Sequence, residues 1–498
     1  SRAGPARPVR PILFASRSGA ASRSGVASRA GTVSCAGATV GTRGSAAPGT
    51  RVRPSSVRPP AALDTGTPCA MRRRSMLLGG AGLAIAGALA ACGHSGGAGA
   101  TASAASTTGP APGSAASGAT AVSAATTAAA APEYHEASAS STALSAGSWS
   151  GAIGDKTMTL SGAHIVDGIE ATIDGGTFES TSADEAVFLV VGGGSLTITN
   201  ARINKSGDAS TDGRHGVDDS YNFYGLNSAV VVVGEGSTAA VRQTTLTTSS
   251  SGSNAVVATG SATATVTGCA ISTTGESSRG LHATYAGVIN GSDLTIETRG
   301  AHCAAVATDR GSGTVAVDGA NTFTTSGDGS PCIYSTGDIA VSGLTGTANG
   351  AQAVVVEGKN RATVTDSTLV TASQTGGVML YQSMSGDAAD SDAAKEVSTL
   401  VMTGVSLTCT QAVPILYVTN TSSQATLTQC TLQTPGGLAT ADEDRWGKTG
   451  SNGGELALTL DATSSDGAIA AGSTSSITVT TANGGAATGA TSGNVTVS

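Results

Sequence analysis

A six-residue pattern of apolar and polar positions recurs along the central part of the chain. Each copy runs apolar, polar, two variable residues, one small or hydroxylated residue, and apolar again. The copies occupy residues 173–178, 198–203, 241–246, 266–271, 289–294, 364–369, 402–407 and 427–432. Most starts lie 23 to 25 residues apart or near multiples of that spacing, and Val315 and Val341 fill two of the missing places. A period of this length predicts a repeat protein in which each copy belongs to one turn.

A second register of short strands lies half a turn after the first. It is formed by residues 255–259, 280–284, 304–308, 332–336 and 353–357, each a short alternating apolar run bounded by Gly, Asn or Asp. Such runs are typical of strands. Several strands per turn, with no helical stretch between them, predict an all-β fold: a right-handed parallel β-helix of about ten turns.

The composition agrees with a narrow solenoid core. Only 3% of the residues are aromatic, whereas 70 residues are glycine. A stacked solenoid tolerates this composition because its core is filled by ladders of small and β-branched side chains.

The first 92 residues have the features of a leader followed by an export signal. Residues 1–70 show no apolar periodicity, so we expect unfolded upstream sequence ahead of a start at Met71; a transit peptide is the alternative. Residues 71–92 then contain three arginines, a short apolar segment and Leu-Ala-Ala-Cys ending at Cys92. This segment resembles a bacterial lipoprotein signal peptide, with features of a twin-arginine signal. The resemblance implies lipidation of Cys92 and attachment to the cell membrane on its extracytoplasmic face.

Charge and composition divide the rest of the chain. Residues 93–145 are mostly Ala, Ser, Thr and Gly, and we expect a disordered linker because this composition cannot bury enough apolar surface. The β-helix is expected over residues 146–455, and residues 456–498 are expected to form Thr/Gly/Ala-rich strands or a cap. Residues 75–498 hold 13 basic and 33 acidic residues, a net charge of −20. So acidic a body repels phosphate backbones, which argues against nucleic acid as a partner.

Several strings carry a resemblance to a known family. They are SRGLHATYAG, GAHCAAVATDRGSGTV, SGDGSPCIYSTGDIAVSG, AVVVEGKN and DRWGKTGSNGG. Over about residues 150–455 the chain resembles exported right-handed β-helix proteins described as adhesin-like or pectin-lyase-like. The resemblance implies a surface-displayed β-helix and brings no lyase motif with it.

The five cysteines of the repeat region are Cys269, Cys303, Cys332, Cys409 and Cys430. Their number is odd and no CxxC pair is present, so the spacing indicates neither a zinc site nor a complete disulfide framework. We expect buried thiols that fill the core, and a single bridge between Cys303 and Cys332 is the alternative.

Polar residues at the end of the second register predict a functional stripe. The alignment places one column at Thr259, Thr284, Thr308, Thr336 and Glu357. The stripe beside it is Tyr285, Asp309, Arg310, Asp338, Glu357 and Lys359. Because adjacent turns lie about 4.8 Å apart, we expect these side chains along one groove.

Three interpretations of the stripe remain open. It could be a ladder of salt bridges, a glycan-binding surface, or a catalytic site. A polysaccharide lyase would use Arg310 or Lys359 as the base and Asp309, Asp338 and Glu357 as calcium ligands.

Three loops interrupt the repeat, at residues 205–222, 383–396 and 442–454. Insertions of a solenoid gather on its functional edges. Asp387, Asp390 and Asp392 in the second loop could bind calcium, and solvated loop acids are the alternative. Calcium is the one cofactor that the sequence raises.

Taken together, these patterns predict a lipid-anchored surface β-helix that takes part in adhesion or carbohydrate binding. The expected partner is an extracellular polysaccharide or another cell surface. The alternatives are a lyase or hydrolase acting on acidic glycans, and a structural surface protein without a ligand.

Overall fold

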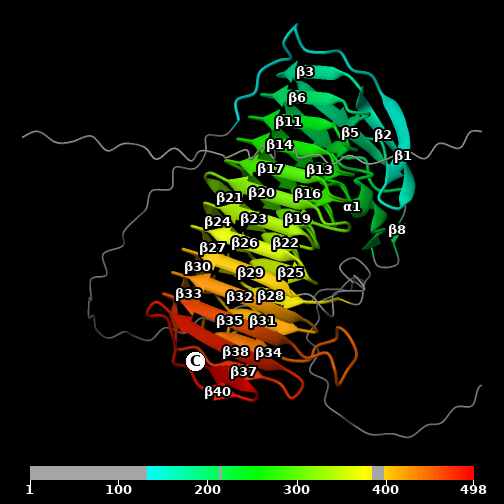
Figure 1. Ribbon diagram of the computed structural model, residues 1–498. Coiled ribbons are helices and arrows are strands. Elements are labelled where there is room, and N and C mark those ends of the chain that lie inside the picture. The colour runs from blue at the N-terminus through cyan, green and yellow to red at the C-terminus, as the bar shows by residue number, and fades with distance from the viewer. Residues whose placement is uncertain (1–131, 211, 214–215, 384–396) are drawn as a thin grey trace, which may run out of the picture. The chain divides into compact units, whose positions relative to one another are not determined.

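The computed structural model describes residues 132–498, except for 211, 214–215 and 384–396. The predictions for the leader and for Cys92 lie outside these residues, as does the linker up to residue 131. The prediction of a disordered linker was wrong for its last part, which the structure describes from residue 132. Here the amides of Ser138 and Thr142 donate to the carbonyls of Asp174 and Thr172 at 2.8 and 2.7 Å, and Leu144 packs against the core. The described strands form three long sheets that wind around one core, which confirms an all-β parallel solenoid (Figure 1).

The first sheet, sheet A, has 14 strands. They are β1 (Gly147–Ile153), β2 (Lys156–Asp167), β5 (Glu185–Val191), β10 (Val230–Val233), β13 (Val256–Thr259), β16 (Leu281–Thr284), β19 (Val306–Thr308), β22 (Ile333–Ser335), β25 (Val354–Glu357), β28 (Val378–Tyr381), β31 (Leu416–Thr419), β34 (Ala439–Ala441), β37 (Ile469–Ala471) and β40 (Thr491–Ser492).

The second sheet, sheet B, has 13 strands. They are β3 (Glu170–Asp174), β6 (Ser195–Thr199), β11 (Thr238–Arg242), β14 (Thr263–Thr267), β17 (Val288–Ser292), β20 (Thr314–Asp318), β23 (Asp338–Ser342), β26 (Arg361–Thr365), β29 (Ser398–Thr403), β32 (Ser422–Thr428), β35 (Glu455–Asp461), β38 (Ser476–Ala482) and β41 (Val495–Val497).

The third sheet, sheet C, has ten strands. They are β4 (Thr177–Ser180), β7 (Arg202–Lys205), β12 (Thr245–Thr248), β15 (Ala270–Thr273), β18 (Thr295–Thr298), β21 (Asn321–Thr325), β24 (Leu344–Ala348), β27 (Thr368–Thr371), β30 (Ser406–Cys409) and β33 (Thr431–Gln433). Two further pairs, β36 (Ser464–Ser465) with β39 (Ala486–Ala487) and β8 (Asp212–Gly213) with β9 (Gly216–Val217), and one short helix, α1 (Ser220–Tyr224), complete the described elements.

The solenoid has about 13 turns, so the expected number of about ten was too low. The three additional turns are those of β35, β38 and β41, in the Thr/Gly/Ala-rich C-terminal segment. The six-residue pattern did not identify them because its second apolar position, which lies in sheet C in the earlier turns, falls on Ser465 after β35. Leu458, Leu460 and Val479 are nevertheless buried in the same core as the preceding turns.

The strands stack in register, so that like positions of successive turns form ladders. In sheet A, Val230 pairs with Val256, Val256 with Leu281 and Leu281 with Val306, all in parallel. In sheets B and C buried and accessible residues alternate, as in β12 and β14. This alternation is what a strand with one face in the core and one in solvent requires.

Sheet A differs from the other two sheets because it is buried on both faces. Every residue of β10, β13, β16, β25 and β28 is buried. The expectation of alternating runs was therefore wrong here, and a continuous run such as Val230–Val233 is the pattern of a strand covered on both sides.

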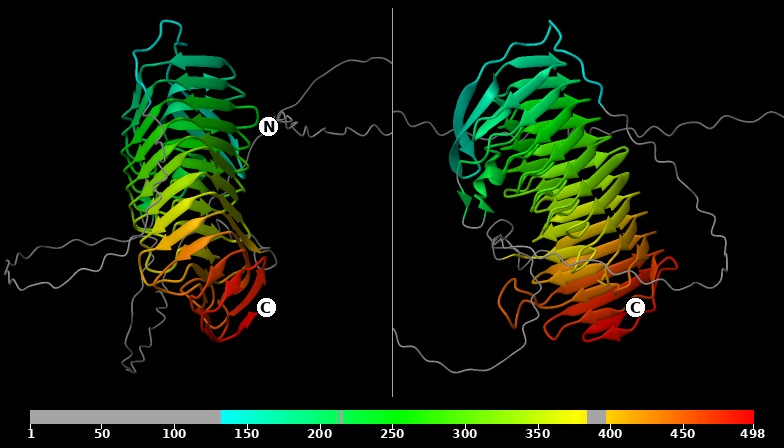
Figure 2. Two further views of the ribbon diagram at one scale, coloured as in Figure 1. Left: turned by 90° about the vertical axis from the view of Figure 1, so that its left-hand side faces the viewer. Right: turned by 180° about the vertical axis from the view of Figure 1, so that it is seen from behind.

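The outer face of sheet A is covered by the chain's own additions. At the N-terminal end, β1 and β2 form an antiparallel hairpin whose Ile153 and Leu160 pack with Val231 and Val257. Phe223 and Tyr224 of α1 join the same apolar cluster. Figure 2 shows the hairpin lying beside the strands of sheet A that follow it.

Glycine at the corners allows the turns to approach closely. A Cβ atom on Gly300 would lie 2.0 Å from the carbonyl oxygen of Gly275, one turn earlier. No larger residue fits such a position, which accounts for part of the high glycine content. Within the described ranges, no helix has the length and apolar character needed to cross a bilayer.

Candidate functional site

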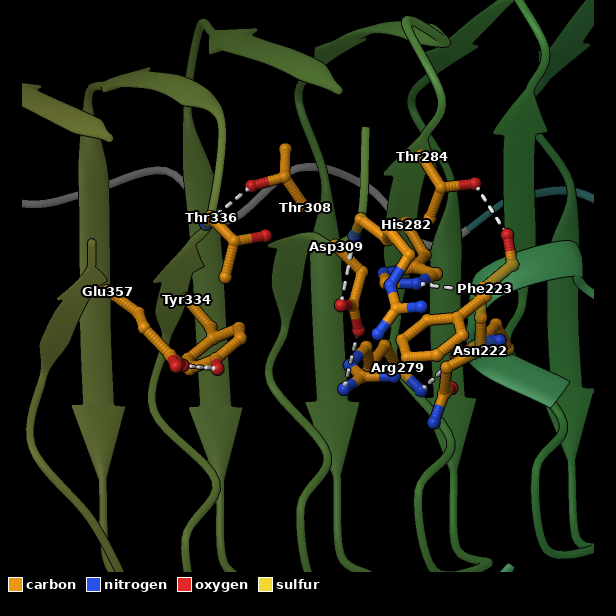
Figure 3. A network of polar contacts seen from close by, with 12 residues as sticks. Asn222, Phe223, Arg279, His282, Thr284, Thr308, Asp309, Tyr334, Thr336 and Glu357 are labelled. Carbon is orange, nitrogen blue, oxygen red and sulfur yellow. Dashed lines mark hydrogen bonds and ion pairs between the residues drawn. The ribbon is translucent and has the colours of Figure 1, made fainter. Parts of the chain in front are cut away.

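Four of the six residues of the predicted stripe, Tyr285, Asp309, Arg310 and Glu357, lie at the outer face of sheet A. At β19 the register differs by one residue from the expected one. Thr308 pairs with Ala283, and the Asp309 amide donates to the Ala283 carbonyl, so Asp309 stands opposite Thr284. The expected column through Thr308 was therefore wrong at this turn. The Thr308 hydroxyl is buried and accepts a hydrogen bond from the Thr336 amide at 2.9 Å (Figure 3).

Tyr285 and Arg310 hold the helix α1. The ring of Tyr285 stacks on that of Tyr224 with centroids 5.4 Å apart, and the two hydroxyls are 3.1 Å apart. The Arg310 guanidinium lies 4.2 Å from the centroid of the Phe223 ring. Burial and Tyr224 raise the pKa of Tyr285 well above its usual value. Tyr285 and Arg310, two residues of the predicted stripe, thus contact the helix α1.

His282 and Thr284 bind the backbone of the same helix. The Thr284 hydroxyl donates to the Phe223 carbonyl at 2.8 Å, and His282 Nε2 lies 3.0 Å from the Asn222 carbonyl (Figure 3). A carbonyl only accepts hydrogen bonds, so Nε2 carries the proton and His282 Nδ1 is the acceptor nitrogen. The side chain is fully buried, and burial, followed by the nearby Arg279 charge, lowers the pKa of His282 well below its usual value.

Asp309 forms a buried ion pair with Arg279. Arg279 Nη2 is 3.3 Å from Asp309 Oδ2, and the two side chains are 12% and 7% exposed. Asp309 Oδ1 also accepts the Arg310 amide at 3.0 Å. Removing one partner of such a pair leaves a buried charge, so this contact fixes the turn beneath α1.

Glu357 is enclosed by tyrosines. It is 1% exposed and accepts a hydrogen bond from the Tyr381 hydroxyl at 2.7 Å. It accepts a second one from the Tyr334 hydroxyl (Figure 3). Burial and the neighbouring Glu357 carboxylate raise the pKa of both tyrosines well above the usual value.

The third insertion, at residues 442–454, contacts the outer face of sheet A at β28 and β31. The rings of Tyr381 and Trp446 lie 5.3 Å apart, and the Tyr417 hydroxyl donates to Asp444 Oδ2 at 3.0 Å. Asn452 donates to the carbonyls of Asp444 and Trp446, which fixes the insertion in this position.

Asp338 and Lys359 lie apart from the other predicted residues. Asp338 is the first residue of β23 in sheet B, exposed, and paired in register with Thr314 and Arg361. Lys359 is half-buried in the turn between β25 and β26. The expectation that all six residues share one groove was therefore wrong, because a corner of the solenoid separates Asp338 from the outer face of sheet A.

The three carboxylates proposed as calcium ligands do not converge. Asp309 is paired with Arg279, Glu357 with two tyrosines, and Asp338 belongs to another sheet. Over the residues that the structure describes, no group of three His, Cys, Asp or Glu side chains could hold a metal ion. Asp387, Asp390 and Asp392 lie outside those residues.

The cysteines fill the interior as free thiols. The alternative of a disulfide between Cys303 and Cys332 was wrong, because one side chain lies at a corner of the solenoid and the other lies in its apolar core. Cys303 Sγ donates towards the carbonyls of Gly275 and Ala301 at the corner, at 3.1 Å each. Cys332 instead lies in the main apolar core.

An open hollow of the described surface lies on sheet B. A shallow hollow of about 320 Å³ crosses the outer faces of β14, β17, β20, β23 and β26. Thr265, Asn290, Ala316, Ala340 and Thr363 lie along its middle, and Asp318 is its single charged lining residue. Sequence reasoning missed this site. The sequence carries no local signal for it, because strands outside the hollow have equally short residues at the same position, such as Thr197 in β6 and Ala240 in β11.

No known protein-family model matches the chain, and no curated protein shows significant similarity to it.

Proposed function

We propose that the protein is a surface-displayed β-helix that binds an extended polysaccharide along the hollow of sheet B. The observation that carries the proposal is the continuity of the hollow over five successive strands. Its hydroxyl and amide groups suit sugar hydroxyls, and its alanine and threonine methyl groups suit the apolar faces of sugar rings.

Two features favour sheet B over sheet A as the binding face. The residues of the predicted stripe on sheet A are engaged with α1, with Arg279 or with buried tyrosines, so a glycan would have to displace internal contacts. The central residues of the hollow are accessible, and Asn290 and Ala340 are exposed.

The predicted lipoprotein signal belongs to the same proposal. Acylation at Cys92 would attach the chain to the membrane, and the linker from residue 93 up to residue 131, where the described part of the chain begins, would carry the β-helix away from it. Intact-mass analysis of the membrane-extracted protein tests this part: an acylated N-terminal Cys92 is expected, and a released chain with another first residue would contradict it.

A glycan array tests the binding function directly. The full chain is compared with Ala340→Trp, which fills the hollow, and with Thr345→Trp, which places the same bulk on an exposed position of sheet C. We expect binding to a polysaccharide that falls at least about tenfold in the Ala340 variant, a change of about 1.4 kcal/mol, and is kept in the control. Equal binding by both variants would place the site elsewhere. Absorbance from unsaturated sugar products would indicate a lyase instead.

A further inference from the structure

We infer that the hollow of sheet B selects a polysaccharide that carries free amino groups, such as a polymer of glucosamine. This inference rests on the proposed function and names the class of ligand. It is carried by the distribution of charge around the hollow, which is one-sided.

Carboxylates follow one edge of the hollow. Asp318 is the last residue of β20, and Asp293 and Asp366 come directly after the last residues of β17 and β26. All three are exposed. Because these strands are neighbours in sheet B, the three carboxylates lie at the same corner within four consecutive turns.

Basic residues around the same hollow are fewer than acidic ones. None of the lining residues is basic. On the opposite edge Arg361 begins β26, with Asp338 beside it in register, and Lys359 lies in the turn before it. On the edge of the carboxylates, Arg242 ends β11, one strand beyond the hollow. The surroundings are net negative because four carboxylates, Asp293, Asp318, Asp338 and Asp366, face three basic residues, and none of these three lies on the carboxylate edge between β17 and β26.

The spacing of the carboxylates suits a polymer. Neighbouring strands lie about 4.7–4.9 Å apart, so the three carboxylates recur at intervals of one and two strand spacings along the solenoid. A chain of amino sugars laid in the same direction presents ammonium groups in a row. Each exposed contact is weak, but contacts repeated along one polymer act together.

The same charges disfavour acidic polymers. A uronate chain would bring carboxylates against Asp293, Asp318 and Asp366 on a body whose net charge over residues 75–498 is −20. A neutral polymer would gain the contacts of the hollow without the attraction. The expected order of affinity is amino, then neutral, then acidic polysaccharide.

The test compares two probes with one backbone. Hexaglucosamine and its fully N-acetylated form are titrated against the full chain at low and high salt. We expect a preference of about tenfold for the free amine at low salt, and we expect salt to reduce it. Asp318→Asn should lower this preference several-fold without weakening the binding of the acetylated probe. Glu170→Gln, which removes an exposed acid from the far end of the same sheet, should leave the preference unchanged.

The outcomes separate this inference from the proposed function. Equal affinity for both probes, with loss of both in Ala340→Trp, would overturn the amine preference and keep the binding site. A preference that survives Asp318→Asn as well as it survives Glu170→Gln would also overturn it. Failure of the full chain to bind any glycan would remove the proposed function itself.

Discussion

Tyr224 and Tyr285 stack almost in parallel, with an angle of 8° between the rings and 5.4 Å between their centroids, although 61 positions separate them. One belongs to the short helix α1 and the other to the turn after β16. The stack joins an insertion to a turn of the solenoid that comes later in the chain. It explains why Tyr285, a residue of the predicted stripe, contacts a protein side chain.

Replacing Tyr285 with alanine should release α1. The substitution removes the ring stack and part of the packing around Phe223 and Val257, so we expect a loss of about 2–3 kcal/mol of unfolding free energy. Hydrogen exchange should accelerate at residues 220–226, with little change in the turns beyond β29. Thr324→Ala, on the outer face of sheet C, is the control. Unchanged exchange in the helix would contradict the role given to this stack.

His282 should make the unfolding free energy depend on pH. Because burial holds its folded pKa well below 6.5, only the unfolded chain takes up this proton as the pH falls below about 6.5. Stability should therefore fall with decreasing pH in that window, by at most about 1.4 kcal/mol per pH unit from this group. Urea unfolding of His282→Gln at pH 7.5 and 5.0 should show a smaller loss than the parent chain. The half-buried His164, whose pKa is also lowered by burial, should leave some dependence of the unfolding free energy on pH in the variant. If the variant kept the full pH dependence of the parent chain, His282 would be excluded as its source.

Glu357 should contribute to stability through its two tyrosines. Glu357→Gln keeps the shape but removes the charge that accepts both hydroxyl groups, and hydrogen bonds to charged groups contribute about 1.5–3 kcal/mol each. We expect a loss of about 2 kcal/mol, measured by urea unfolding. Tyr417→Phe, whose hydroxyl contacts the less buried Asp444, should cost less. A Glu357 variant as stable as the parent would show that the carboxylate is dispensable there.

The raised pKa values of Tyr334 and Tyr381 predict a spectroscopic signature. Both groups stay protonated in the folded protein above the usual tyrosine pKa of about 10, so their contribution to stability is lost as the pH rises beyond that value. Absorbance at alkaline pH should show a late ionisation step that coincides with unfolding. Ionisation of every tyrosine in one early step would be inconsistent with the enclosed cluster.

The buried cysteines should be inert in the folded protein. Burial raises the pKa of both Cys303 and Cys332 to about 12, so neither presents a thiolate at neutral pH. A thiol reagent should label them only after denaturation, and a reducing agent should leave the melting temperature unchanged. Rapid labelling of Cys303 or Cys332 in the native chain, located by peptide mapping, or a melting temperature lowered by reduction, would contradict this.

The sequence pattern predicted the fold class correctly because the apolar positions recur at a regular spacing. Val241 and Val266, one repeat apart, pair in adjacent strands of sheet B. Small errors arose where the corner length changes: the run at residues 304–308 starts one residue earlier relative to its strand than the run at 280–284. A one-residue offset moves Thr308 inward and Asp309 outward, which is beyond the resolution of a repeat alignment.

The candidate site was harder to predict because its contacts are non-local. The contact of Arg310 with Phe223 joins a turn of the solenoid to an insertion three strands earlier in sheet A. Nothing in the local sequence of either residue indicates the other. The hollow of sheet B depends on five short side chains from five turns, and each of them alone is an ordinary strand residue.

The insertion that contains α1 has a mechanical consequence. Tyr221 of the helix donates a hydrogen bond to Asp184 at the entry to β5, while Phe223 contacts Arg310 beyond β19. The helix therefore links β5, β10, β13, β16 and β19, whereas the stacked strands themselves pair only with their neighbours. A pulling force applied at the N-terminal end should meet these turns as a single block that yields in one step.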